Sequence, residues 1–107
     1  MPVTYLIEFH VAPVQRNRFL ELLNGVLDAM RSEPMFHEAV LHRDPNAENH
    51  FMLYETWESH EDVLEVQLHR PYRQAWHQAL DSLLERPRGV SIWEPLRADR
   101  KVGPTSG

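Results

Sequence analysis

The sequence predicts a single α+β domain in which two helices cover one face of a four-stranded antiparallel sheet. Three observations support this fold class. The chain opens with a strand whose apolar residues alternate at every second position, it contains two amphipathic helical stretches, and prolines and polar turns separate the elements. The resulting element order is strand, helix, strand, strand, helix, strand. A chain of 107 residues has the length of one domain with a thin core.

The first strand is expected at residues 3–11 and the first helix at residues 13–32. One face of the strand carries Val3, Tyr5, Ile7, Phe9 and Val11. The apolar residues with helical spacing are Phe19, Leu20, Leu22, Leu23, Val26, Leu27 and Met30. Pro13 suits the first turn of this helix, and Pro34 ends it. Gly25 weakens the helix by up to about 1 kcal/mol relative to alanine, and a close contact with the sheet would explain its presence.

The second half of the chain predicts a hairpin, a broken helix and a short last strand. Strands at residues 36–43 and 50–57 flank a polar turn at residues 44–49. Ser59 is suited to cap a helix over residues 60–69, Pro71 interrupts it, and a second helical stretch covers residues 72–85. The fourth strand is expected at residues 90–94. We therefore expect a domain over residues 1–96 and a flexible C-terminal tail over the polar residues 97–107.

Composition and charge argue against several classes of protein. The formal net charge is −5, whereas a nucleic-acid-binding protein normally carries a basic excess. No apolar run approaches the roughly 20 residues of a membrane span, and the first ten residues lack the pattern of a signal peptide, so we expect a cytoplasmic protein. There are no cysteines, which excludes disulfides, thiolate metal sites and a cysteine nucleophile.

The open face of the sheet is expected to be covered by a second copy of the chain. A βαββαβ order, the ferredoxin-like arrangement, places both helices on one face. The other face would then be polar at every second position, but the third strand carries Met52 and Tyr54 on one side and large apolar residues on the other. Trp93 of the fourth strand adds to this face. Apolar patches of this kind usually mark an interface, so we expect a homodimer with a two-fold axis.

Several short motifs occur in an order typical of one known family. They are VAP at residues 11–13, RF at 18–19, RSEP at 31–34, RDP at 43–45, FMLYETWES at 51–59, Leu68 with PY at 71–72, and WEP at 93–95. The segment at 51–59 is the most specific of them. Through these motifs, residues 3–95 resemble the antibiotic biosynthesis monooxygenase (ABM) domain family.

The resemblance implies a ferredoxin-like, dimeric α+β barrel, often with the C-terminal region reaching across to the partner. It also implies oxygenation of quinols or aromatic polyketides without metal, flavin or haem, although some members degrade haem. This chain departs from the family at Val14 and Met35, which replace glycines, and at Gln67, where many members carry histidine. Haem-degrading members use an asparagine of the first strand, which is absent here, so that only His77 matches them and haem degradation is not expected.

The candidate site is an aromatic, histidine-rich pocket between sheet and helices. Its candidate residues are Tyr54, Trp57, Tyr72, Arg73 and Trp76 for substrate binding, and His69 and His77 for catalysis. A cofactor-free oxygenase must bind a planar aromatic, remove a phenolic proton and stabilise the anion. Aromatic faces, a histidine and an arginine suit these tasks. The deprotonated substrate could then reduce oxygen by one electron. On an unbroken helix, which Pro71 argues against, the spacing of His69, Arg73 and His77 would form a polar ridge that either lines a pocket mouth or, as we favour, faces water.

No metal and no cofactor are expected. The chain has seven histidines, but the HEAVLH segment at 37–42 has one residue more than the zinc-protease motif and lies in a strand, where His37 and His42 point to opposite faces. The leading function is therefore a cofactor-independent monooxygenase acting on an aromatic, quinol-like or polyketide-like small molecule. The alternative is a non-catalytic dimeric module that binds a small ligand or serves in a stress response, which Gln67 favours.

Overall fold

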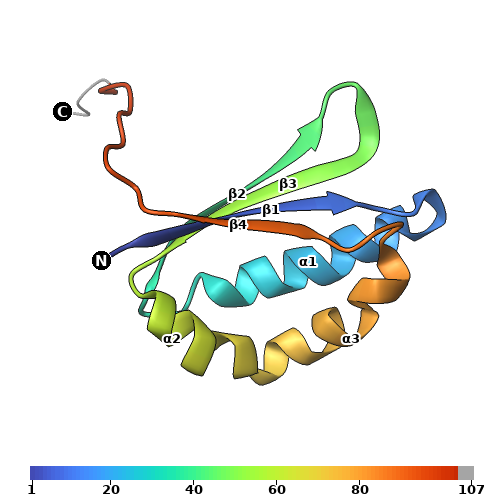
Figure 1. The fold of residues 1–107 in the computed structure, drawn as a ribbon, viewed down its shortest axis with the longest axis horizontal. Helices are drawn as coiled ribbons and strands as arrows, with labels where there is room; N and C mark the ends of the chain where they lie inside the picture. Colours follow the sequence, from blue (N-terminus) through green and yellow to red (C-terminus); the bar gives the residue numbers. More distant parts are fainter. Residues whose placement is uncertain (104–107) are drawn as a thin grey trace.

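The computed structural model describes residues 1–103 and confirms the expected element order (Figure 1). The strands are β1 (Val3–His10), β2 (Phe36–Asp44), β3 (Ala47–Trp57) and β4 (Gly89–Trp93). The helices are α1 (Arg16–Met30), α2 (His60–Glu65) and α3 (Gln74–Leu83), joined by the 3₁₀ turns η1 (Pro13–Gln15), η2 (Gln67–His69) and η3 (Pro71–Arg73). Two differences from expectation are that β3 extends into the predicted polar turn and that α2 ends at Glu65 instead of near residue 69.

The four strands form one antiparallel sheet in the order β2-β3-β1-β4, which is the ferredoxin-like topology. β1 is central, and it pairs with β3 along its whole length and with β4 on its other side. Because side chains alternate along a strand, this register sorts them between the two faces. The pair Tyr5 and Glu55 faces the helices, whereas the neighbouring pair Leu6 and Tyr54 faces away from them.

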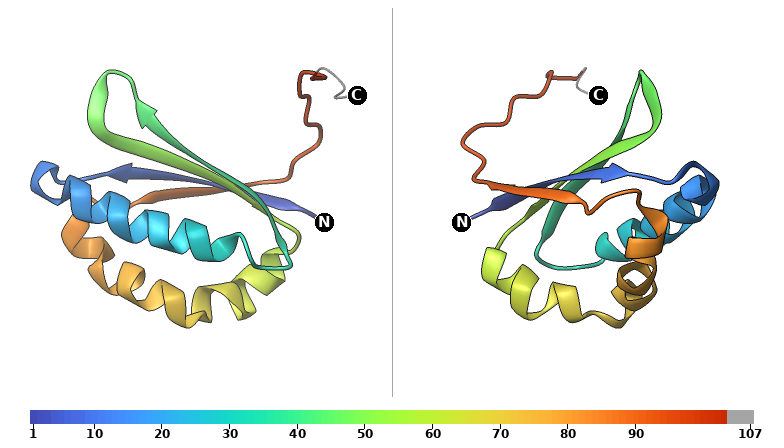
Figure 2. Two further views of the ribbon diagram at one scale, coloured as in Figure 1. Left: turned by 180° about the vertical axis from the view of Figure 1, so that it is seen from behind. Right: turned by 45° about the vertical axis from the view of Figure 1, so that its right-hand side comes forward.

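The core lies between one face of the sheet and the helices, which form a separate layer (Figure 2). Its centre is a cluster of aromatic rings. The ring centroid of Phe9 lies 5.1 Å from that of Phe19 and 5.7 Å from that of Trp76. Phe19 also lies 5.1 Å from Phe51. Burying a side chain of this size contributes roughly 1.5–3 kcal/mol, so this cluster fixes α1 and α3 against the sheet.

The second helical region is broken, as Pro71 predicted. α2 ends at Glu65, Arg70 has an extended backbone with φ −62° and ψ 133°, and α3 begins only at Gln74. The residue before a proline avoids the helical conformation, and proline lacks the N–H that a continuing helix needs. α2 and α3 therefore form an arc below the sheet (Figure 1).

One expectation about α1 is wrong. Gly25 makes no close contact with the sheet, because a Cβ atom added there would find no heavy atom within 4 Å. Leu23 and Val26 point into the core, and the helical turn places Gly25 on the exposed side of α1. A side chain would therefore fit at this position.

The other face of the sheet has no helix over it among the described residues. The chain after β4 rises from this face at one end, and the β2–β3 hairpin curls upward at the other, so that the face forms a saddle (Figures 1 and 2). Residues 97–103 are exposed without helix or strand, and Arg100 Nη2 lies 3.1 Å from Glu38 Oε2. The predicted tail begins here, and its residues 104–107 lie outside the described part. Within residues 1–103, no helix has the length and apolar character needed to cross a membrane.

Candidate active site

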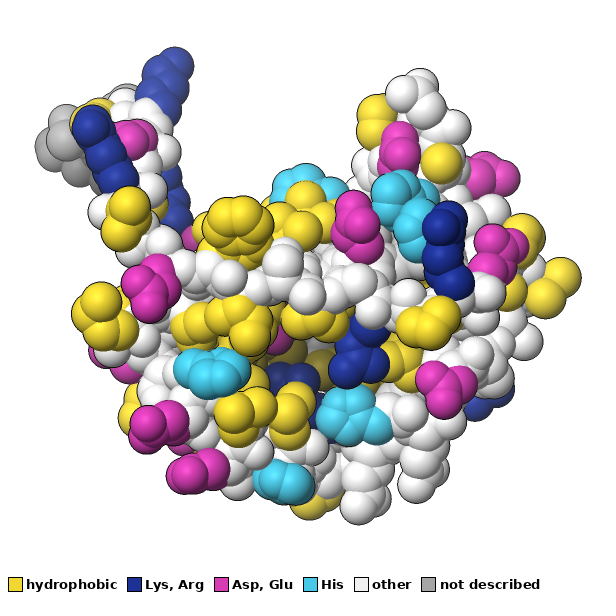
Figure 3. Space-filling model, viewed as in Figure 1, with side chains coloured by type: hydrophobic (Ala, Val, Ile, Leu, Met, Phe, Trp, Pro, Cys, Tyr) yellow, Lys and Arg dark blue, Asp and Glu magenta, His cyan; other side chains and the backbone are white. Residues whose placement is uncertain are grey.

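A cavity of about 220 Å³ lies between the helix-facing side of the sheet and the helices. Its apolar lining consists of Ile7, Phe9, Leu23, Val26, Met30, Leu53, Val63, Leu64, Leu68, Trp76, Val90 and Ile92. Val90 and Ile92 of β4 face the helix side but remain half exposed, because no helix reaches this edge of the sheet. Figure 3 shows the hollow below β4, with apolar, histidine and basic side chains around it.

Arg73 supplies a buried cation to this cavity. Its guanidinium carbon lies 5.8 Å from the ring centroids of Trp57 and of Tyr72, which favours a cation–π contact with both rings. The residue is only 6% exposed, and its Nε and Nη2 atoms are buried without a hydrogen-bond partner. Because these two atoms have almost no accessible surface, Arg73 acts on the cavity through its positive charge, which favours a ligand that carries an anionic oxygen.

Glu55 on β3 is a buried carboxyl group that lines the same cavity. Burial raises its pKa, although the charge of Arg73 and a hydrogen bond donated by Trp57 Nε1 to Glu55 Oε1, at 3.2 Å, act in the opposite direction. The sequence analysis did not select Glu55 as a site residue. A signal was present, because Glu55 is the one charged residue on the β3 face that carries Phe51, Leu53 and Trp57.

Tyr5 and His60 form a second polar pair in the cavity, which sequence reasoning missed. The hydroxyl oxygen of Tyr5 lies 2.6 Å from His60 Nδ1. Burial, and then the charge of Glu55, raise the pKa of Tyr5. Its hydroxyl therefore keeps its proton at neutral pH and can donate a hydrogen bond to the imidazole. Tyr5 is on β1 and His60 begins α2, and no sequence pattern indicates that these two residues meet.

Of the two histidines expected to be catalytic, His77 lines the cavity. Burial lowers its pKa, and the nearby charges of Arg73 and Arg88 lower it further. His77 is therefore mainly neutral at neutral pH, and in this form an imidazole nitrogen can accept a proton. Arg73 lies one helical turn earlier, so a cation and a proton acceptor border the same cavity.

The other sequence-predicted residues divide into two groups. Trp76 lines the cavity together with Arg73 and His77. Trp57 does not line it, since it is fully buried in the core beside the Arg73 guanidinium. Tyr72 also lies outside the lining, and its hydroxyl donates a hydrogen bond to Glu33 Oε1 at 3.3 Å.

His69 and Tyr54 are placed away from the cavity. His69 lies on η2 with an exposed side chain, and because Pro71 breaks the helix, it shares no continuous helical ridge with Arg73 and His77. The expectation that Tyr54 lines the cavity is wrong. Tyr54 lies on the open face of the sheet, where its hydroxyl is 3.4 Å from Glu38 Oε2. Strand alternation explains this placement, because the cavity residues of β3 are its neighbours Leu53 and Glu55.

Gln67, at the position where many family members carry histidine, is part of a buried polar network outside the cavity lining. Its Nε2 donates hydrogen bonds to Glu33 Oε2 at 3.1 Å and to Asp62 Oδ2 at 3.2 Å. Burial opposes ionisation of Glu33, but hydrogen bonds from Gln67, Arg70 and Tyr72 outweigh it and hold the pKa of this carboxyl below its usual range. Gln67, on η2, therefore links α2 to the segment that follows α1.

The fold and the cavity together define a small α+β protein whose site can bind a compact apolar molecule that carries an oxygen acceptor. The chain belongs to the antibiotic biosynthesis monooxygenase (ABM) family, whose model matches residues 2–84. Members of this family are commonly dimeric.

Individual relatives agree with this assignment. The chain is 30% identical over 95 residues to the protein named "Putative monooxygenase GME11364" of Pestalotiopsis microspora, an alignment that covers 88% of this chain and 79% of that protein. The structure of Rv0793 from Mycobacterium tuberculosis superposes with a TM-score of 0.83 at 22% identity, covering 94% of this chain and 100% of that one. The structure of SnoaB, a cofactor-independent oxygenase from Streptomyces nogalater, superposes with a TM-score of 0.77 at 18% identity, covering 91% of this chain and 95% of that one. At these identities the two structures establish the shared fold.

Proposed function

We propose that this protein is a cofactor-independent monooxygenase of a small aromatic, quinol-like compound. The observation that carries the proposal is the buried guanidinium of Arg73, whose positive charge borders an apolar cavity that a neutral histidine also lines. Apolar walls accept a planar ring, and the guanidinium complements an anionic oxygen on it. SnoaB, which shares the fold, is described as a cofactor-independent oxygenase.

The proposed chemistry begins with removal of a phenolic or enolic proton. Neutral His77 accepts this proton, and Arg73 stabilises the anion that forms. The electron-rich anion passes one electron to O₂, and the resulting substrate radical and superoxide combine to form a carbon–oxygen bond. The peroxide anion takes back the proton held by His77. Its O–O bond then breaks as the same carbon loses its hydrogen, which releases water and leaves a quinone carbonyl. One oxygen atom thus enters the product, the other leaves as water, and the substrate supplies all the electrons.

The size of the cavity narrows the proposed substrate. A dry protein cavity of about 150 Å³ is known to hold benzene. The cavity here measures about 220 Å³, which suits a compound of one or two rings better than a four-ring polyketide. We therefore favour benzenoid or naphthalenoid hydroquinones.

The assembly belongs to the same proposal. The saddle-shaped open face carries Leu6, Met52, Tyr54 and Trp93 on its apolar part, and Trp93 is 60% exposed. A second copy of the chain would cover these side chains, and homodimerism is common in the family.

The alternative of ligand binding without turnover loses its main support. It depended on the absence of histidine at Gln67, but Gln67 lies outside the cavity lining and in a structural network. The two functions are separated by one experiment on oxygen consumption.

Oxygen uptake is measured with one- and two-ring hydroquinones, without added metal, flavin or haem, and corrected for uncatalysed oxidation. We expect protein-dependent uptake and a quinone product that contains one atom from ¹⁸O₂. We expect His77→Ala to lower kcat/KM at least about a hundredfold, the usual contribution of a positioned base, whereas His69→Ala keeps the rate. Saturable binding of the hydroquinone with no protein-dependent uptake would establish the alternative instead. Equal loss in both variants would remove His77 from the proposed mechanism.

A further inference from the structure

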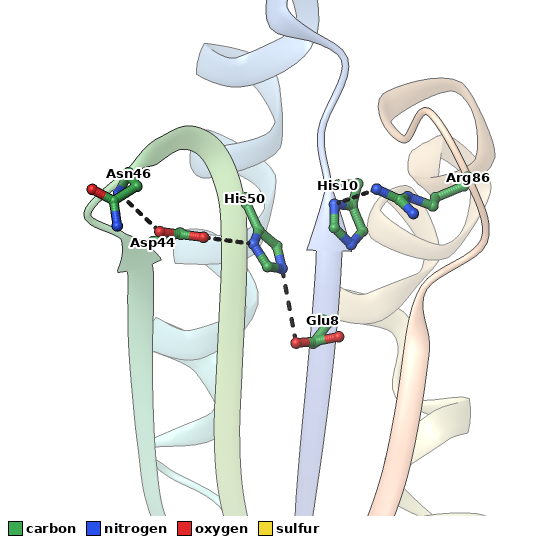
Figure 4. A network of polar contacts seen from close by, with 6 residues as sticks. All are labelled: Glu8, His10, Asp44, Asn46, His50 and Arg86. Atoms are coloured by element: carbon green, nitrogen blue, oxygen red, sulfur yellow. Dashed lines mark hydrogen bonds and ion pairs between the residues drawn. The ribbon is translucent and has the colours of Figure 1, made fainter.

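A cluster of two histidines and a glutamate lies on the open face of the sheet, away from the cavity. Glu8, His10 and His50 each offer a ligand atom, and these atoms lie within 4.8 Å of one another. His10 and His50 are direct partners in the β1–β3 register, and Glu8 is two positions before His10 on the same face. Figure 4 shows the two imidazoles side by side above the Glu8 carboxylate. Their ring centroids are 4.2 Å apart, with 13° between the ring planes.

Asp44 fixes the protonation of His50. Asp44 Oδ2 lies 3.1 Å from His50 Nδ1, and Asp44 Oδ1 accepts a hydrogen bond from the backbone N–H of Asn46 at 2.8 Å. A carboxylate oxygen accepts hydrogen bonds, and here it faces a ring nitrogen. His50 Nδ1 therefore carries the proton, and a neutral His50 has its lone pair on Nε2.

The Nε2 atom of His50 has no hydrogen-bond partner although it is buried. It lies 3.8 Å from Glu8 Oε1, and both atoms are acceptors when His50 is neutral. A proton on His50 Nε2 would turn this contact into an ion pair with Glu8. A metal ion about 2.0–2.2 Å from each atom would satisfy both atoms and also use the nearby imidazole of His10.

His10 provides the third ligand, and Arg86 competes for it. Arg86 Nη2 lies 3.1 Å from His10 Nδ1, a contact that places the imidazole proton on Nε2. The Arg86 side chain is exposed and can move away from His10 at little cost in free energy. The imidazole proton can then move to Nδ1, which leaves Nε2 of His10 free to bind a metal ion.

We propose that Glu8, His10 and His50 form a binding site for a divalent transition-metal ion of the zinc type, with Asp44 orienting His50. Imidazole and carboxylate ligands suit Zn²⁺ and its neighbours, whereas Mg²⁺ and Ca²⁺ prefer sites made of oxygen atoms. A carboxylate behind a metal-binding histidine is the usual supporting contact in such sites. Three protein ligands leave a coordination position for water. A hollow beside the two histidines, lined also by Asn49 and Glu85, offers a path for the ion.

This site is independent of the proposed oxygenase. The cavity lies under the sheet, and the three ligands lie on its other face. Sequence reasoning, which expected no metal, considered only the histidines of one strand, and this cluster joins β1 to β3.

The test uses the full, tag-free chain after treatment with a chelator. Zn²⁺ binding is measured by calorimetry, and Co²⁺ binding by its visible absorption, which reports nitrogen and oxygen coordination. We expect one ion per chain. Glu8→Gln and His50→Gln should each weaken binding more than tenfold, and Asp44→Asn should weaken it about 10–100-fold. Arg86→Gln should strengthen binding severalfold, because it removes the competitor of His10.

His37→Gln is the matched control. His37 Nε2 also lies close to a carboxylate, 2.9 Å from Glu58 Oε2, but this pair is exposed and is not part of a three-residue group. We expect its Zn²⁺ affinity to equal that of the original chain, and circular dichroism verifies the fold of each variant. Absence of saturable Zn²⁺ binding to the original chain would overturn the proposal. So would unchanged affinity in folded His50→Gln, or a loss in His37→Gln as large as in His50→Gln.

Discussion

At the scale of single residues, the side chains whose burial costs folding free energy lie beside the cavity. A buried guanidinium with unpartnered donors, a buried carboxyl group and a neutral histidine each reduce the stability of a small domain. Arg73, Glu55 and His77 all line one hollow, so this cost is concentrated where a ligand can compensate for it. Perturbed titratable groups that gather in a cavity are a physical indication of a functional site.

The pH dependence of catalysis tests the role of His77. A base acts in its neutral form, so kcat/KM should rise with pH through the pKa of His77, which burial, Arg73 and Arg88 place below the ordinary value of about 6.5. Arg88→Gln removes one of the lowering charges and should move this acid limb to higher pH. Arg86→Gln removes a charge that does not face His77, so the acid limb of its pH profile should stay at the same pH. An acid limb that persists in His77→Ala would assign it to another group.

The site was predictable from the sequence only where its residues share one element. Arg73, Trp76 and His77 occupy a single helical segment and line the same cavity, although the spacing of Arg73 and His77 alone favoured a surface facing water. Tyr5 and His60 meet only because β1 and the start of α2 fold against each other, which no local pattern encodes.

At the scale of elements, hydrophobic periodicity predicted most of the fold. The alternation in β1, the apolar stripe of α1 and the break at Pro71 each follow from local geometry, and all three are observed. The exact ends of β3 were not predictable, because pairing with β2 extends the strand through polar residues. Side-chain direction within the hairpin was equally hard to assign, since β3 carries large residues on both faces, and Tyr54 was therefore expected both on the open face, where it lies, and in the cavity, where it does not.

Helix α1 offers a direct test of local helix preference. Gly25 is exposed on α1 and has free space for a methyl group, so Gly25→Ala should stabilise the protein by about 1 kcal/mol. For a domain near this size, that corresponds to a rise in Tm of about 4–8 °C. Gly103→Ala serves as control, because Gly103 has the same free space but lies outside any helix. Thermal unfolding checks the pair, and equal shifts in both variants would show that helix preference is not the cause.

At the scale of the whole molecule, the two faces of the sheet have different surroundings. One face is closed by helices and holds the cavity, and the other is open, concave and partly apolar (Figure 3). A domain of this size cannot bury both faces with its own helices, because the single crossover between β1 and β2 and the arc from α2 to α3 lie on the same side. In the proposed homodimer, a second copy of the chain covers this face.

Replacement of Leu6 by glutamate tests that requirement. Leu6 is half buried near the middle of the open face, opposite Tyr54 on one side and Ser91 on the other. An unpaired charge enclosed by an interface costs about 3 kcal/mol or more, which weakens association at least about a hundredfold. Size-exclusion chromatography with light scattering at micromolar concentration should therefore give a dimer for the original chain and a folded monomer for Leu6→Glu. Val14→Glu is the control, since Val14 is 91% exposed on η1 and lies on no strand, so it should remain dimeric. A monomeric original chain, or a dimeric Leu6→Glu variant, would show that a different surface, or none, joins two copies.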